Sequence, residues 1–326
     1  MSFNENRIGR RAFLVLSAGA LLCKQAFARS DFPNKPVKVV VPYLPGGNSD
    51  VLGRMLARGL SALYGQQFFV ENKSGSNSII GTNYVAKSPA DGYTLLFAIS
   101  ALANNETLYK RLPYKRSELT AVAGVARTPL VLATGHPVES LQKFIEFLHG
   151  RSMVSYATSG VGSAAHLLSE RFVQAMNLQS ATHVAYKGSA AIIADLVPGR
   201  VDFTFDSVTL MGGLIKQGKL HALAVTSEER LPALPTVPTL KELGFPSLTF
   251  YVWGGVFAPA ATPPAVVDSL SAAVQEVLGK PEVRAKLREL NIEPFLIKSA
   301  EFNRFIDRDI QESGDLIRRM KVVLDQ

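Results

Sequence analysis

Short runs of β-branched and apolar residues alternate with helical patterns along this chain, and that alternation constrains the fold more than any other feature. The first runs occupy residues 37–43, 67–70 and 93–97, and apolar residues at helical spacing lie between them. Runs of this kind fit strands of a parallel sheet that is buried on both faces. The β-α-β-α-β order therefore predicts an α/β unit with helices on the faces of its sheet.

The same alternation starts again in the second third of the chain. Strands are predicted at residues 130–133, 154–157, 182–185, 201–205, 221–226 and 250–257, and helices near 139–149, 163–176, 189–197 and 209–217. The last quarter is predicted to be helical. Thr262 is the expected cap of a helix that starts at Pro263 and ends at Gly279, and a final helix is expected from about Ser299.

Composition and charge exclude several classes of protein. The chain of 326 residues is 47% hydrophobic and 19% charged, an ordinary globular composition and a length suited to about two domains. Its formal net charge is +8, but the basic residues are scattered. A nucleic-acid partner is not expected, because binding would need a basic stripe with interleaved aromatic residues. A mildly positive protein is compatible with an anionic ligand.

The first 28 residues are typical of a cleaved signal peptide. A basic segment is followed by an apolar run from Phe13 to Leu22 and by the small-residue site Ala26-Phe27-Ala28. The run is too short to cross a bilayer core of about 30 Å. Arg10 and Arg11 fit a twin-arginine export signal, with an ordinary Sec signal as the alternative. Cleavage after Ala28 would remove Cys23, the only cysteine, and leave a mature periplasmic chain without disulfides.

Two glycine-rich turns each join a predicted strand to a predicted helix. They are Pro45-Gly46-Gly47-Asn48-Ser49-Asp50 and Ser159-Gly160-Val161-Gly162-Ser163, and Gly75-Ser76-Asn77-Ser78 precedes a third helix. Ligands of open α/β sheets bind outside the carboxyl ends of the strands, where helix N-termini favour anions. The turns are candidate carboxylate cradles, with simple capped turns as the alternative. Neither matches a Walker loop or a dinucleotide fingerprint.

Searches for catalytic and metal-binding patterns find little. A Gly-x-Ser-x-Gly elbow is absent, and the five histidines show no zinc-ligand spacing. Asp202 and Asp206 lie four residues apart in a predicted strand, which separates them by about 13 Å. That distance is too long for an acid/base pair of carboxylates. The sequence therefore predicts no catalytic residue, no metal site and no cofactor.

The order and spacing of many motifs resemble one known family over nearly the whole chain after residue 32. The motifs include Val-Val-Pro-Tyr-x-Pro-Gly-Gly-x-x-Asp at residues 40–50, Ser-Gly-x-Gly-Ser-x-x-His at 159–166 and Leu-Pro-x-Val-Pro-Thr at 234–239. They are similar to those of the periplasmic solute-binding receptors of tripartite tricarboxylate transporters, also called Bug receptors. The chain departs from the family at Ser76-Asn77-Ser78, where glycines are usual, and at Glu106, where the family often has proline.

The resemblance implies a two-lobed periplasmic-binding-protein fold, a Venus flytrap whose lobes are each a mainly parallel sheet flanked by helices. Residues 29–127 and 251–326 would form the first lobe, and residues 128–250 the second. Such a receptor is not an enzyme. It would be a monomer that holds a small carboxylate, an organic acid or amino acid, between its lobes and delivers it to membrane permease subunits.

Carried onto this chain, the resemblance places ligand contacts in the loops already identified. They are Tyr43, Gly46, Gly47, Asn48, Ser49, Asp50, Ser76, Asn77, Ser78, Ser100, Ser159, Gly160, Gly162, Ser163, Asp206 and Ser207. Two alternatives remain open from the residues alone. One is an exported sensor subunit that docks a signalling receptor. The other is a serine hydrolase that uses Ser159 or Ser163 with His166. Ser163 and His166 are three residues apart at a helix start, so contact between them is possible.

Overall fold

Three neighbouring strands in the sheet of the first lobe are parallel. The computed structural model describes residues 32–324, so the predicted signal peptide lies outside the described residues. β1 (Val37–Val41) lies between β2 (Phe68–Asn72) and β3 (Thr94–Ile99). Val39, Val40, Leu95 and Leu96 are fully buried, from both faces of the sheet, because helices cover both sides.

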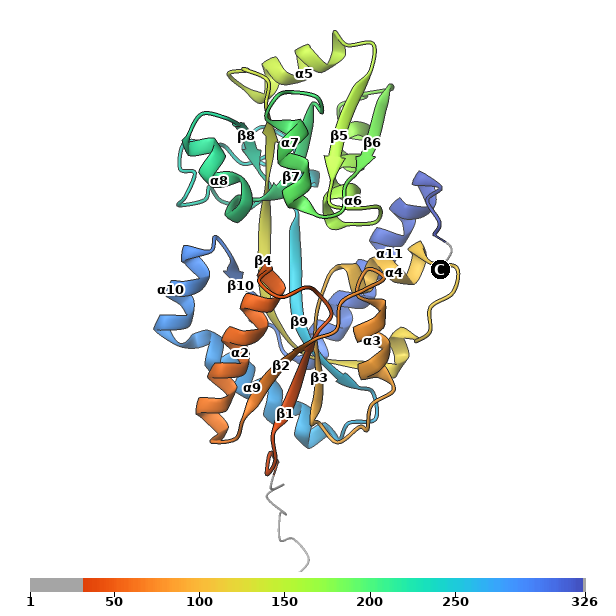
Figure 1. Cartoon of the computed structure of the whole chain (residues 1–326), viewed down its shortest axis with the longest axis vertical. Helices are drawn as coiled ribbons and strands as arrows, with labels where there is room; N and C mark the ends of the chain where they lie inside the picture. The colour runs from red at the N-terminus through yellow and green to blue at the C-terminus, as the bar shows by residue number, and fades with distance from the viewer. Residues whose placement is uncertain (1–31, 325–326) are drawn as a thin grey trace, which may run out of the picture.

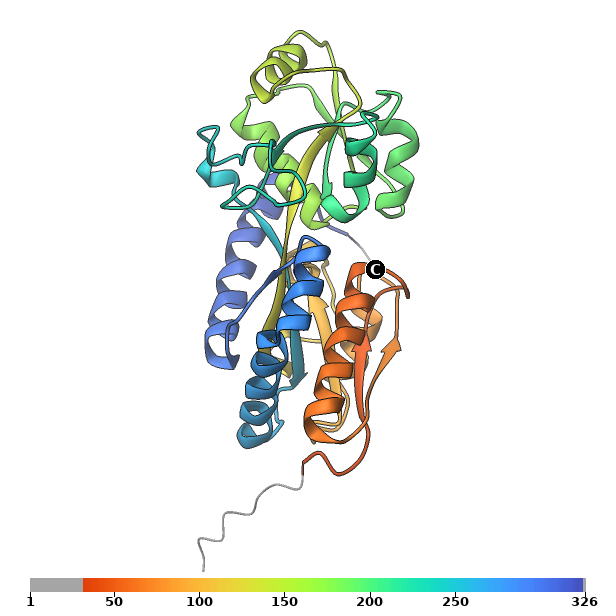
Figure 2. The same cartoon turned by 90° about the vertical axis from the view of Figure 1, so that its left-hand side faces the viewer.

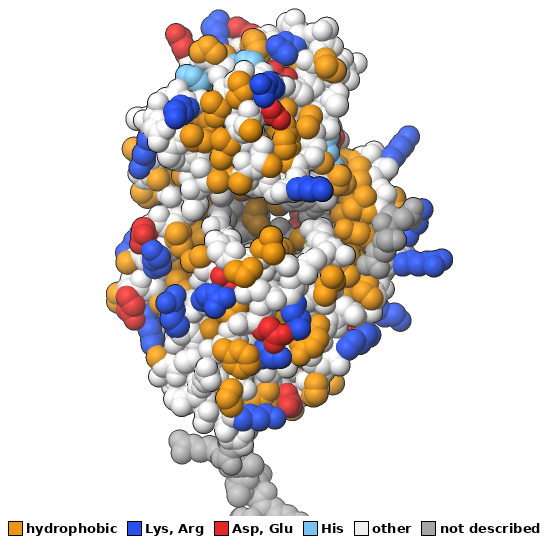
Figure 3. All heavy atoms as spheres, viewed as in Figure 1, with side chains coloured by type: hydrophobic (Ala, Val, Ile, Leu, Met, Phe, Trp, Pro, Cys, Tyr) orange, Lys and Arg blue, Asp and Glu red, His pale blue; other side chains and the backbone are white. Residues whose placement is uncertain are grey.

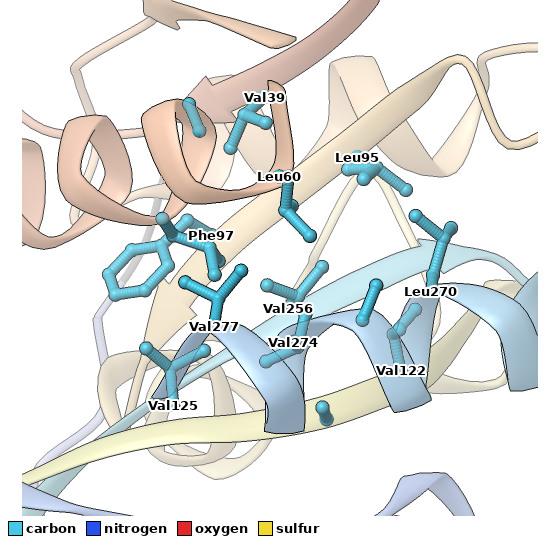
Figure 4. Packing of buried hydrophobic residues seen from close by; sticks show 14 of the residues in the cluster. Val39, Leu60, Leu95, Phe97, Val122, Val125, Val256, Leu270, Val274 and Val277 are labelled. Carbon is cyan, nitrogen blue, oxygen red and sulfur yellow. The ribbon is translucent and has the colours of Figure 1, made fainter. Parts of the chain in front are cut away.

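Helices from both ends of the chain cover this sheet. One face carries α2 (Asn48–Tyr64), α9 (Pro264–Gly279) and α10 (Pro281–Glu289), and the other carries α3 (Ile79–Ala86), α4 (Ala101–Leu108) and α11 (Ser299–Met320). Figure 4 shows Leu60 of α2 and Val277 of α9 close to Phe97 of the sheet, in one apolar cluster. Burial of each such side chain contributes roughly 1.5–3 kcal/mol to the free energy of unfolding. The C-terminal helices thus complete the first lobe.

The second lobe repeats this plan on a smaller scale. β5 (Val154–Thr158) lies between β6 (Ala181–Ala185) and β7 (Phe203–Ser207), and all three strands are parallel. The helices α5 (Leu141–His149) and α6 (Ala164–Ala175) cover one face, and α7 (Ile193–Leu196) and α8 (Val208–Lys216) cover the other. This lobe has its own apolar core, in which Tyr156, Phe172 and Phe203 are fully buried.

Two antiparallel strands run between the lobes. β4 (Leu119–Thr134) pairs with β9 (Tyr251–Pro259) in the first lobe, and its last residues then pair with β7 and with β8 (His221–Val225) in the second. The short β10 (Glu293–Pro294) also pairs with β4. Figures 1 and 2 show β4 and β9 crossing the waist of the molecule. The predicted α/β fold is confirmed. Three strands of each lobe are parallel, and the crossing strands add antiparallel pairs.

The lobe boundaries stay a prediction. Residues 127 and 128 lie within β4, and residues 250 and 251 lie at the start of β9, so both boundaries fall at the crossing strands. We propose that these strands act as the hinge. No helix among residues 32–324 combines the length and hydropathy that a membrane span requires.

Three local predictions differ from the structure. The helix expected from Pro263 begins at Pro264, because Pro263 precedes another proline and is therefore held in an extended conformation, with ψ 133°. The segment predicted as one helix at 189–197 is a 3-10 turn, Ser189–Ile192, followed by α7. The helix α4 was not predicted at all, since it shows little amphipathic periodicity.

A further contact joins the lobes away from the crossing strands. Leu316 and Ile317, near the end of α11, pack with Leu108 of α4 and with Leu167 of α6 in the second lobe. Figure 2 shows α11 running along one side of the molecule towards the second lobe. Next to this cluster, the buried Asn104 side chain donates a hydrogen bond of 3.0 Å to the carbonyl oxygen of Gly162.

Candidate functional site

A cavity of about 740 Å³ lies between the two lobes, and Figure 3 shows the hollow at the waist of the molecule. The volume is within the usual range for small-molecule sites. Most of the predicted site residues line it: Tyr43, Gly46, Gly47, Asn48, Ser49, Asn77, Ser100, Ser159, Gly160, Ser163, Asp206 and Ser207. Loops that lie far apart in the sequence therefore meet at one cleft.

Four helices point their N-termini at this cleft. The residues that cap α2, α4, α6 and α8 are Gly47, Ser100, Ser163 and Ser207, and all four line the cavity. In α2, α4 and α8 no cap side chain bonds to the first turn, so main-chain N–H groups remain free for a ligand or water. Each terminus carries roughly half a positive charge. Two termini come from each lobe, which gives the cleft a positive potential without cationic side chains.

The first glycine-rich turn is held from behind by Asp50. This carboxylate is buried and accepts hydrogen bonds from the Gly46 main-chain N–H, from the Arg54 guanidinium at 3.0 Å and from the Asn72 amide. The bond from Arg54 is the largest cause that lowers the pKa of Asp50, to about 2. Asp50 was predicted as a ligand contact but does not line the cavity. Its interactions are satisfied within the turn, so it shapes Gly46 and Gly47 instead.

The turn before α3 contains three consecutive residues with left-handed backbone, Ser76, Asn77 and Ser78, at φ of 45°, 48° and 74°. Only Asn77 lines the cleft. Ser76 faces a second cavity of about 470 Å³ beside α3, and Ser78 is buried. Ser76 and Ser78, which were predicted as ligand contacts, are therefore not part of the cleft lining.

The second glycine-rich turn bridges the two lobes. The Gly162 N–H donates to Nδ1 of His166 over 3.0 Å, and its carbonyl oxygen accepts from Asn104 of the first lobe. Gly162 has a φ of 74°, and an added Cβ would lie 2.1 Å from a methyl group of Leu108. Gly162 was also predicted as a ligand contact, yet it lies behind the lining formed by Ser159, Gly160 and Ser163.

The two aspartates of the β7 region occupy separate sites. Asp202 is fully buried, where it accepts from the Ser155 N–H at 2.7 Å and contacts His136 and Arg151. Asp206 lines the cleft at the other end of the strand. The prediction that they do not form a catalytic pair agrees with these positions. Among the described residues, no group of three or more His, Cys, Asp or Glu side chains is arranged to hold a metal ion.

Several lining residues were not predicted. The crossing strands supply Ala126, Thr128, Leu130, Val252 and Gly254, and the loop after β6 supplies Ser189 and Ala190. This segment follows the strand predicted at residues 182–185, so its position after a strand could have identified Ser189 as a candidate. Nothing local distinguishes Thr128 from any other strand residue, since it reaches the cleft only because β4 crosses between the lobes.

Comparisons with known proteins identify the family of the chain. The model of the tripartite tricarboxylate transporter family receptor matches residues 52–322. The chain belongs to this family. BugT of Bordetella pertussis is 35% identical over 293 residues, which cover 88% of this chain and 90% of BugT.

Solved structures of similar proteins carry carboxylates. An R. palustris protein with adipate has a TM-score of 0.80 at 34% identity and covers 90% of this chain and 100% of its own. A Rhodopseudomonas palustris protein with bound malate has a TM-score of 0.75 at 27% identity, over 88% and 100% of the two chains. Receptors of the tripartite tricarboxylate transporter family are periplasmic solute-binding proteins rather than enzymes.

The hydrolase alternative has no support in this tripartite tricarboxylate transporter receptor. Ser163 Oγ accepts from the main-chain N–H of His166, so it caps α6. The His166 ring is buried, its Nδ1 accepts from Gly162, and burial lowers its pKa to about 3. It also stacks on His183, with ring centroids 3.8 Å apart. The imidazole therefore supports the turn and is not directed at a nucleophile.

Proposed function

We propose that this receptor captures a small carboxylate in the cleft between its lobes and delivers it to the membrane subunits of a tripartite tricarboxylate-type transporter. The observation that carries the proposal is the convergence of four helix N-termini, two from each lobe, on one cavity. Free main-chain N–H groups at such termini bind anions. The adipate and malate bound to two similar proteins are consistent with this ligand class.

Closure of the lobes follows from the same arrangement. An anion that bridges termini from both lobes binds the closed state better than the open state, and this difference shifts the population towards closure. The crossing strands β4 and β9 line the cleft and would bend as the lobes approach, in a hinge motion.

A charge placed in the cleft tests the binding role. Ser159→Asp introduces a carboxylate into the lining, and we expect it to weaken binding of a carboxylate at least tenfold. Ser152→Asp adds the same charge at an exposed position before β5 and should leave affinity unchanged. The measurement is calorimetric titration with a panel of dicarboxylates, amino acids and aromatic acids. If no acid in the panel binds the unaltered protein, the proposal fails.

We also propose export through the N-terminal signal, with Arg10 and Arg11 as the twin-arginine pair, and function as a monomer. Replacing both arginines by lysine should stop export if the Tat route is used and leave it intact if the Sec route is used. Mass spectrometry of the exported protein would show whether it begins at Arg29. Light scattering at micromolar concentration would give the oligomeric state, and a stable dimer would contradict that part of the proposal.

A further inference from the structure

Among residues 32–324, the lining of the cleft contains one carboxylate, that of Asp206. Asp206, at the end of β7, is only 7% exposed. Its Oδ1 accepts from the Ser207 N–H over 2.7 Å. The hydroxyls of Ser189 and Ser207 lie near enough to lower the pKa of this carboxyl against the larger, opposite effect of burial, but among the described residues no donor is in hydrogen-bond geometry at the buried Oδ2. A buried acceptor without a partner costs roughly 1–3 kcal/mol. A donor that enters the cleft would remove this cost.

The cavity lining offers no such donor from a cationic side chain. Within the described part of the chain, its residues include no lysine, arginine or histidine. Asp206 is therefore the one carboxylate of the lining, and it directly precedes the N-terminus of α8. It offsets part of the positive potential there, while the termini of α2, α4 and α6 keep theirs. The lining thus favours a carboxylate at these termini and a hydrogen-bond donor at Asp206.

A second carboxylate of a ligand would be poorly placed against Asp206. Two carboxylates that share a site repel each other, and one of them has to bind a proton. A hydroxyl or ammonium group in the same place would instead donate to Oδ2. The wall beside Asp206 is mixed. Leu130 and Phe205 offer apolar surface to the body of the ligand, and Ser189 and Ser207 offer hydroxyl groups.

We propose that the ligand is a carboxylate whose far end carries a hydrogen-bond donor, a hydroxyl or an ammonium group, that binds Oδ2 of Asp206. The carboxylate of the same ligand binds the helix N-termini away from β7. This inference rests on the proposed function, because it concerns the second functional group of the captured molecule. Asp206 is then a residue that determines specificity between donor-bearing acids and plain dicarboxylates.

Matched series of ligands test this directly. The six-carbon series is hexanoate, adipate, 6-hydroxyhexanoate and 6-aminohexanoate, with 1-hexanol as the neutral control, and four- and five-carbon series are built in the same way. At the chain length that binds best, we expect the hydroxy or amino acid to bind the unaltered protein at least tenfold more tightly than the dicarboxylate. A dicarboxylate that binds equally well or better overturns the inference.

A variant checks that Asp206 is the cause. Asp206→Asn keeps the Oδ1 acceptor for the Ser207 N–H and removes the charge, so the fold should persist, and its thermal unfolding is measured alongside. The preference for the donor-bearing acid should fall at least tenfold. Asp315→Asn removes an equal charge from the exposed surface of α11 and should leave the preference unchanged.

The outcomes separate the two proposals. If acids bind but Asp206→Asn leaves the preference unchanged, the inference about Asp206 is wrong and the receptor function stands. If no acid in any series binds more tightly than its neutral alcohol, the proposed function is contradicted, and the inference falls with it.

Discussion

Asn105 holds Asn77 by two hydrogen bonds at once. Its side-chain amide donates to the Asn77 carbonyl oxygen over 2.9 Å, and its Oδ1 accepts from the Asn77 side chain over 2.8 Å. Asn105 is fully buried in α4, whereas Asn77 lines the cleft in a turn of three left-handed residues. Left-handed backbone costs about 1–2 kcal/mol for an ordinary residue, so the clamp offsets the strain of this turn.

Removing the clamp should loosen the cleft wall. Asn105→Ala eliminates both hydrogen bonds, each with a net contribution of about 1 kcal/mol, and leaves the turn without support. We expect the free energy of unfolding to fall by roughly 2–3 kcal/mol and ligand affinity to fall as well. Urea denaturation and calorimetry measure the two effects.

A glycine provides the control for this mechanism. Ser76→Gly in the Asn105→Ala background should recover part of the lost stability, because glycine adopts a φ of 45° at little cost. Ser74→Gly, at a neighbouring exposed residue without positive φ, should recover nothing. An Asn105→Ala variant as stable as the parent would show that the turn does not need the clamp.

The stacked histidines predict a dependence of stability on pH. Burial lowers the pKa of His183 to about 4 and that of His166 to about 3, with His183 itself as a second cause for His166. In the unfolded chain both imidazoles have a pKa near 6.5, so below about pH 6.5 the unfolded state binds more protons than the folded state. The free energy of unfolding should therefore keep its full value above about pH 6.5 and decline as the pH falls towards about 4 and then about 3, the pKa values of His183 and His166 in the folded state.

Thermal unfolding from pH 7.5 to 3.5 measures this decline. His183→Gln should flatten the pH dependence, since one buried imidazole and its contact with His166 are removed. His149→Gln, at the exposed end of α5, should have a smaller effect. A His183→Gln variant that retains the full pH dependence would assign the decline to other groups.

The contact between Gly162 and Leu108 predicts strong coupling between the lobes. Gly162→Ala places a Cβ 2.1 Å from a Leu108 methyl group and retains a φ of 74°, so we expect a loss of about 1–3 kcal/mol. In a double-mutant cycle with Leu108→Ala, the combined loss should be smaller than the sum by at least about 1 kcal/mol. Gly188→Ala, with φ 96° and open space around it, should show no such coupling. Additive losses in the first pair would disprove the steric explanation.

Ile317 and Ile306 lie on the same helix but serve different contacts. Ile317 belongs to the apolar cluster that spans α4, α6 and α11, whereas Ile306 packs within the first lobe. Either change to alanine should lower the free energy of unfolding by about 2–5 kcal/mol. Only Ile317→Ala should alter the distribution between open and closed shapes of the ligand-free protein, as measured by small-angle X-ray scattering. If both variants give the same scattering, the apolar cluster has no role in lobe movement.

Predictions from the sequence succeeded where the signal was local. The turns at Gly46–Gly47 and Gly160–Gly162 follow recognisable strands and precede helices, so their place at the cleft was readable from neighbours in the sequence. Which residues of each turn line the cleft was harder to predict. Asp50, Ser78 and Gly162 belong to these turns but do not line the cleft, because the direction of a residue within a turn depends on backbone angles that sequence patterns do not specify.

Other features had no local signal. Only residues 130–133 of β4 were predicted as a strand. Its first part mixes alanine and glycine, which have weak strand preference, with valine and threonine, and it is extended because β9 pairs with it. Thr128 reaches the cleft for the same reason. The cluster of Leu108, Leu167, Leu316 and Ile317 joins residues from opposite ends of the chain.

The sequence by itself determined the alternating strands and helices, the glycine-rich turns and the family, because each depends on residues that are close together in the chain. The tertiary structure alone decided that four helix N-termini share one cavity, that Asp206 Oδ2 is left without a partner, and that Asn105 restrains Asn77. These are contacts between distant segments, and their geometry is settled only when the two cores pack and the crossing strands set how the lobes face each other.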